Sequence, residues 1–192
     1  MFKNSKILFA GVLGLFATFV MFTFAQAVNT TVNLSVTAGT VTPASTGTFS
    51  FGAFAVAGTQ TVTGKQFTGT DYFSVTDLKG AFSGWYTTIQ VSDLTGTAGT
   101  ISSGNIALKV VSTGAVLITG TANSNVVVGA TSGTLLNYNA INTAITFLKR
   151  DPATNSGKVG VYAAFPWLQV TIPAYQAVGS YQAILTYTLI EN

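Results

Sequence analysis

The fold class follows from one stretch near the carboxyl end, Tyr181-Gln182-Ala183-Ile184-Leu185-Thr186-Tyr187-Thr188-Leu189. Its odd-numbered positions are apolar, and its even-numbered positions are polar except at Ile184. Successive side chains of a β-strand point to opposite faces, so this alternation predicts a strand with one face in a core. The stretch from Val32 to Thr37 alternates in the same way.

Similar stretches recur along the chain, and short runs of Gly, Thr, Ser and Asn, which favour turns, separate them. Short strands at such spacing predict an all-β fold, a β-sandwich of short antiparallel strands. No long linker divides them, so we expect a single domain over residues 28–192. The expected strands are Thr31–Ala38, Thr48–Phe54, Gln60–Thr63, Asp71–Leu78, Trp85–Val91, Ala107–Val111, Ala115–Ile118, Ala144–Leu148, Val159–Ala164, Leu168–Ile172 and Tyr181–Ile190.

The amino terminus has the three parts of a secretory signal peptide. Lys3 and Lys6 precede an uncharged apolar run from Ile7 to Phe24, and Ala25-Gln26-Ala27 follows it. This order predicts cleavage after Ala27, which would leave an exported protein with no membrane attachment. The alternative is an uncleaved anchor, because the apolar run is near the lower limit for spanning a bilayer.

Composition excludes several classes of function. The 192 residues include no Cys and no His, so a Ser-His-Asp or Cys-His nucleophile, a redox Cys pair and a Cys/His zinc site are all ruled out. Only 7% of residues are charged, and the eight Lys and Arg are scattered, which argues against nucleic acid as a partner. Without Lys3 and Lys6 the exported chain is close to neutral.

Three aspartates remain as candidates for catalysis or metal binding, namely Asp71, Asp77 and Asp93. Their spacing lacks the pattern of a calcium-binding loop, and it does not place two acids across a cleft as glycoside hydrolysis requires. We therefore expect no enzymatic activity, no metal and no cofactor.

Two segments carry a resemblance to a known family. The first is Asp77-Leu78-Lys79-Gly80 followed by Gly84-Trp85, and the second is Ile172-Pro173-Ala174-Tyr175 followed by Gly179-Ser180-Tyr181 and the strand that ends in Tyr187-Thr188-Leu189. In order and spacing they resemble the WxL-domain surface proteins. This chain departs from the family pattern at Lys79, where Arg is usual, at Tyr86-Thr87 after Trp85, and at Tyr187, which takes the place of the second Trp.

The resemblance implies an exported β-domain that attaches without covalent bonds to the bacterial cell wall, through peptidoglycan, often together with other surface proteins. It implies no catalysis. The expected location is therefore the cell surface or cell wall, and the expected partners are a wall polymer or other surface proteins.

Six residues are the candidates for contact with the wall or a partner: Trp85, Tyr86, Trp167, Tyr187, Lys149 and Arg150. A Trp in a sandwich strand is more often a core residue than a stacking platform, and strand alternation places Tyr86 on the face opposite Trp85. Tyr187 fits a core or a subunit interface equally well. The run from Lys149 to Pro152 fits either a solvated loop or a contact with an anionic polymer.

A second class of function is self-assembly. The exported chain would begin with the alternating stretch Asn29–Val36 and would end with another regular strand. A terminal strand is able to pair with the open sheet edge of a neighbouring molecule, as in pilus, filament or surface-layer subunits that form homo-oligomers by strand addition. The alternative is that both terminal strands pair within their own domain.

Overall fold

The computed structural model of the chain describes residues 39–45, 49–55, 58–66, 72–80, 83–112, 115–152 and 158–192. The chain divides into two units, Met1–Val36 and Thr37–Asn192, and every described residue belongs to the second unit. The expected leader at residues 1–27 and the expected strand Thr31–Ala38 lie outside the described residues. In the part of the chain that the structure describes, no helix is long and apolar enough to cross a membrane.

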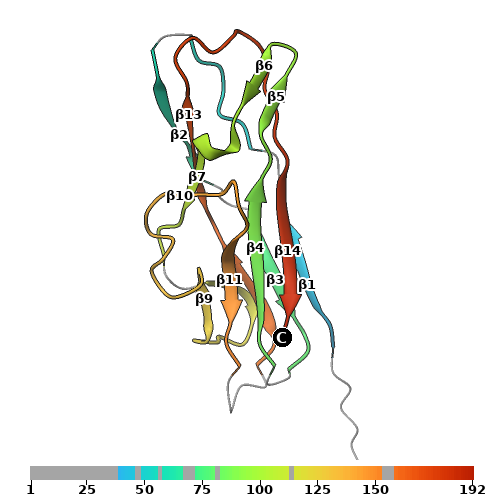
Figure 1. The fold of residues 1–192 in the computed structure, drawn as a ribbon. Helices are drawn as coiled ribbons and strands as arrows, with labels where there is room; N and C mark the ends of the chain where they lie inside the picture. The colour runs from blue at the N-terminus through green and yellow to red at the C-terminus, as the bar shows by residue number, and fades with distance from the viewer. Residues whose placement is uncertain are drawn as a thin grey trace, which may run out of the picture. The chain divides into compact units, whose positions relative to one another are not determined.

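The predicted all-β fold with antiparallel sheets is confirmed (Figure 1). Sheet A has the strand order β1(Val41–Ser45), β3(Phe73–Asp77), β12(Gly160–Ala164), β8(Val116–Gly120). Sheet B has the order β10(Asn139–Ala140), β7(Ile106–Lys109), β13(Trp167–Ile172), β2(Gln60–Gln66). Sheet C has the order β14(Leu185–Glu191), β4(Trp85–Val91), β11(Ile145–Arg150), β9(Val126–Val128). A hairpin of β5(Leu94–Gly96) and β6(Gly99–Ile101) and a short 3₁₀ turn, η1(Ser103–Asn105), precede β7.

Sheets A and C pack against each other as the two layers of a sandwich. The ring of Phe73 on β3 lies edge-on to Phe147 on β11 and to Tyr187 on β14, with centroid distances of 5.6 Å and 5.1 Å. Aromatic pairs favour this edge-to-face geometry. Buried residues alternate with half-buried or exposed ones along β4, so the prediction that Trp85 and Tyr86 lie on opposite faces is confirmed.

The chain passes from sheet A to sheet B between two consecutive strands. β12 ends at Ala164, and β13 begins at Trp167 after Phe165 and Pro166. Proline has no backbone N–H for a sheet hydrogen bond, so Pro166 fits a position between the last residue of a strand in sheet A and the first residue of a strand in sheet B. Leu168 and Val170 of β13 then join the buried core.

The observed strands differ from the expected ones at several places. Residues 49–55 form no strand; instead Phe49 and Phe51 pack edge-on to each other, 4.6 Å apart, and against the core. The strand β1 was not predicted because Pro43 interrupts its pattern, but β1 lies at the edge of sheet A, where proline is tolerated. β14 begins at Leu185 rather than at Tyr181, because Gln182 instead pairs with Thr95 of the β5–β6 hairpin.

The two sides of the sandwich differ in how their edges meet. On one side the edge strand β1 contacts the edge strand β14. On the other side the edges are β8 of sheet A and β9 of sheet C. The exposed edge and the hollow described at the end of the next subsection lie on this second side.

Candidate functional site

Asp77 of the Asp-x-Lys-Gly motif and Trp85 of the Gly-Trp motif meet Arg150 in a buried polar cluster between the sheets. Oδ2 of Asp77, at the end of β3, accepts a hydrogen bond from Trp85 Nε1 at 2.9 Å and another from the guanidinium of Arg150 on β11. Oδ1 of Asp77 accepts a hydrogen bond from the backbone N–H of Lys79 at 3.1 Å. Buried charges need such partners, so the cluster joins three strands from two sheets.

This burial decides the roles of two candidate residues. Trp85 and Arg150 are each only 1% exposed. Trp85 is thus a core residue, which was one of the two roles considered for it from the sequence. Its ring is too deeply buried to stack on a ligand. The interpretation of Arg150 as part of a solvated loop or a polymer contact is corrected, because Arg150 is the last residue of β11 and is paired inside the sandwich.

The glycine before Trp85 is required by a close approach of two chain segments. A Cβ atom at Gly84 would lie 2.7 Å from the carbonyl oxygen of Arg150 and 2.8 Å from Cδ of Pro152. Only a residue without a side chain lets the start of β4 approach the end of β11 so closely. The Gly-Trp pair is therefore explained by packing beside the Asp77 cluster.

Tyr86 and Lys149 meet on the outer face of sheet C. They are direct cross-strand partners on β4 and β11, and Ile190 of β14 is the partner of Tyr86 on its other side. Nζ of Lys149 forms an ion pair with Asp151 at 2.7 Å. A row of threonines follows on the same face, in which Thr88 lies between Thr146 and Thr188.

Trp167 and Tyr187 lie apart from that face. Trp167 is half-buried at the start of β13 in sheet B, and its indole Nε1 has no hydrogen-bond partner among the described residues. Tyr187 is half-buried in β14, and burial raises the pKa of its phenol well above the ordinary value. The six predicted residues therefore do not form one surface, and only Tyr86 and Lys149 are brought together outside the core.

Sequence reasoning found the strand β8 but missed that it is an exposed edge. All five of its residues are exposed, including the consecutive apolar residues Val116, Leu117 and Ile118. Among the described strands β8 pairs only with β12, so its other edge presents unpaired backbone groups. The strand has no charge and no proline, the features that usually protect an edge from pairing with other chains.

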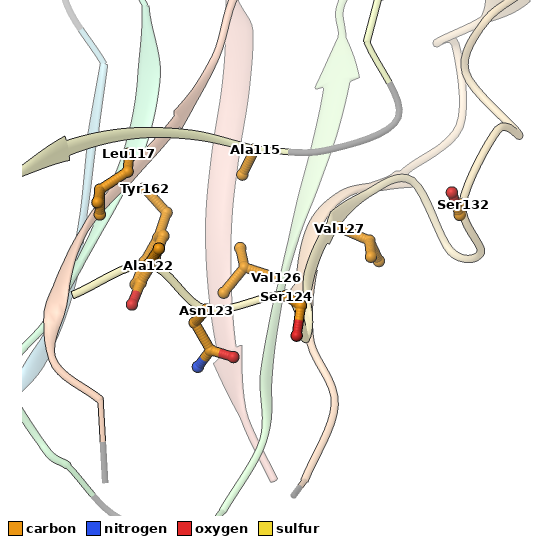
Figure 2. A pocket seen from close by; sticks show the side chains of 9 residues that line it. All are labelled: Ala115, Leu117, Ala122, Asn123, Ser124, Val126, Val127, Ser132 and Tyr162. Carbon is orange, nitrogen blue, oxygen red and sulfur yellow. The ribbon is translucent and has the colours of Figure 1, made fainter. Parts of the chain in front are cut away.

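A hollow of about 420 Å³ lies beside this edge (Figure 2). Side chains of β8, of the β8–β9 connection, of β9 and of β12 line it: Ala115, Leu117, Ala122, Asn123, Ser124, Val126, Val127, Ser132 and Tyr162. Leu117 and Tyr162 are cross-strand partners, so they share the face of sheet A that meets the hollow. The hollow is thus placed where the two sandwich layers end at β8 and β9.

Polar side chains, among them those of Tyr162 and Asn123, line part of this hollow. The Tyr162 hydroxyl donates to the Thr121 carbonyl at 2.8 Å, and burial, with a contribution from the charge of Asp77, raises the pKa of Tyr162. Oδ1 of Asn123 accepts from the backbone N–H of Asn125 at 3.0 Å. Nδ2 of Asn123 is buried beside Tyr162, and the Asn123 side chain partly offsets the rise in the pKa of Tyr162.

No protein-family model, no curated protein and no solved structure matches the chain. Its function is therefore inferred from its own residues and geometry.

Proposed function

We propose that the protein is an exported, non-enzymatic structural component of the cell surface, whose domains associate by adding a strand to the β8 edge. The observation that carries this proposal is the exposed apolar edge from Val116 to Ile118, which has no pairing strand among the described residues. Strand addition provides a ladder of main-chain hydrogen bonds and pockets for alternate side chains. The hollow beside Leu117 supplies such a pocket.

The charge distribution favours dense packing of copies. Asp77, Asp151 and Glu191 are paired with Arg150, Lys149 and Lys79 within the domain. These three pairs neutralise six charges within the described part of the chain, and a surface of low net charge promotes association. Thr and Ser, which are polar but uncharged, are frequent in the sequence.

The proposal is tested by assembly of the exported protein. The wild type is expected to form oligomers or filaments, visible by electron microscopy and by pelleting in the absence of any wall material. Ile118→Lys places a charge on the edge and is expected to abolish pelleting. Gln90→Lys places the same charge on the exposed face of the central strand β4 and is expected to have no effect on assembly. A wild type that stays monomeric at all concentrations overturns the proposal.

A second candidate function is attachment to the wall polymer, and the pairing of Tyr86 with Lys149 beside the threonine row supports it. An aromatic ring next to hydroxyls and an ammonium group is a surface suited to a sugar polymer that carries carboxylates. The resemblance to WxL-domain proteins points to the same ligand class. Tyr86→Ala is expected to reduce co-sedimentation with isolated peptidoglycan sacculi, whereas Tyr175→Ala, at an exposed tyrosine elsewhere, should leave it unchanged.

A further inference from the structure

We infer that the strand that completes the β8 edge is the amino-terminal segment Asn29–Ala38 of a second copy of this chain. The inference rests on the proposed function and names its partner segment. It starts from two features that match: an edge strand with apolar side chains and a hollow beside it, and a terminal stretch whose sequence predicts a strand with one apolar face.

The side-chain pattern of the segment fits the hollow. Val32, Leu34 and Val36 would lie on one face of an added strand, and the polar residues between them would lie on the other. The apolar face would cover Leu117 and Val126 at the hollow, while the polar face would extend the outer surface of sheet A. A one-residue shift of register would reverse both faces, so the hollow also selects the register.

The backbone of the added strand would satisfy groups that are otherwise unpaired. The outward N–H and C=O groups of Val116–Gly120 would enter a β-ladder. The segment also carries no charge, so its insertion buries no unpaired ion.

Chain geometry favours a second copy over the same molecule. Gly39 and Thr40 are already hydrogen-bonded to Leu78, next to β1, and β1 is the opposite edge of sheet A from β8. The two edges are three strand spacings apart, about 14 Å, and crossing that distance takes about four residues of extended chain. Within one molecule the crossing would therefore use residues 35–38, including Val36. A second copy is able to deliver the whole alternating segment.

The position of the segment couples assembly to export. The expected cleavage after Ala27 would leave Asn29–Ala38 at the free amino terminus. With the apolar leader still attached, the segment would be tethered to the membrane. Leader removal would thus release the donor strand outside the cell, where acceptor edges are present.

Engineered cysteines test the contact directly, because the natural chain contains no cysteine. Full-length protein carrying Leu34→Cys is mixed after export with protein carrying Leu117→Cys under mild oxidation. The inference predicts a disulfide-linked heterodimer, identified by mass spectrometry of the linked peptides. Ser35→Cys, whose side chain would lie on the other face, is the matched control and should give at least tenfold less heterodimer. Equal yields from the two positions, or no heterodimer, overturn the inference.

The double variant Leu34→Cys/Leu117→Cys separates the two possible donors. Links between molecules support the inference, and a monomer closed by an internal disulfide overturns it in favour of each chain covering its own edge.

A further variant lacks residues 28–36 but keeps all described residues, and it should lose assembly. A synthetic peptide of residues 29–38 should bind to this variant with a stoichiometry of one peptide per chain. If the wild type assembles but the variant lacking residues 28–36 assembles equally well, the segment Asn29–Ala38 is not the donor strand, while the proposed function survives. If the wild type does not assemble, the proposed function itself fails.

Discussion

Asp77 and Arg150, which are 73 positions apart in the sequence, form a buried ion pair that joins β3 of sheet A to β11 of sheet C. The indole of Trp85 on β4 donates to the same carboxylate oxygen. The cluster therefore ties together strands of both layers, and the motif that resembles a surface-binding signature serves here to hold the sandwich together.

Removal of one partner of this pair should be strongly destabilising. Asp77→Ala leaves the guanidinium of Arg150 buried without its counter-charge, which should lower the free energy of unfolding by about 3–5 kcal/mol. Urea denaturation followed by fluorescence measures the change. The double variant Asp77→Ala/Arg150→Met removes both charges and should lose less stability than Asp77→Ala alone. A single variant as stable as the wild type would show that the pair contributes little.

Gly84→Ala should destabilise the same region through the backbone. The added Cβ would meet the Arg150 carbonyl oxygen at 2.7 Å, so the start of β4 or the end of β11 must move. A decrease of about 1–3 kcal/mol in the free energy of unfolding is expected for such overpacking. The matched control is Gly58→Ala, because a Cβ at Gly58 would meet nothing within 4 Å. Equal effects of the two substitutions would contradict the packing explanation.

Burial of Tyr187 predicts a loss of stability in alkali. Its pKa is raised above the ordinary value of 10.0, so folding favours the protonated phenol. The contribution of this group to stability is complete below that pH and decreases as the pH rises above it, because the unfolded chain then releases a proton that the folded chain retains. Absorbance at 295 nm should show a late step in the tyrosine titration, to which Tyr187 contributes when the protein unfolds. Tyr187→Phe should reduce that late step by one tyrosine, and an unchanged titration would be evidence against the assignment.

Asp93 should titrate below its ordinary range. Its Oδ1 accepts hydrogen bonds from the hydroxyl of Ser103 at 2.6 Å and from the backbone N–H of Ser103 at 2.7 Å, and these bonds lower its pKa from 3.8, the side-chain bond most strongly. The associated stability is present above 3.8 and is lost as the pH falls through the folded-state pKa. Ser103→Ala removes the stronger bond and should raise the pKa of Asp93, as measured by NMR titration. A pKa that does not change would show that the backbone bond alone sets it.

Local patterns were sufficient for much of the fold and for little of the site. The alternation in Trp85–Val91 predicted both the strand and its two faces, because that pattern depends only on the geometry of one strand. The burial of Arg150 could not be predicted, since it depends on Asp77 arriving from another sheet. The exposed edge at β8 was also beyond a local pattern, because Ala115–Ile118 has the pattern of an ordinary strand, and only the strand order shows that β12 is its single partner among the described strands. The expected strand Thr48–Phe54 is not formed at the described residues 49–54, because the rings of Phe49 and Phe51 pack against each other there instead of the backbone pairing with another strand.

The most direct test of the central claim is hydrogen–deuterium exchange of the assembled exported protein against the dissociated protein. The account predicts that amides of Val116–Gly120 become protected in the assembly, because their free edge enters a ladder with an added strand. Amides of Val41–Ser45, at the opposite edge of sheet A, should exchange at the same rate in both states. Exchange at Val116–Gly120 that is equally fast before and after assembly would contradict the claim that this edge is the interface.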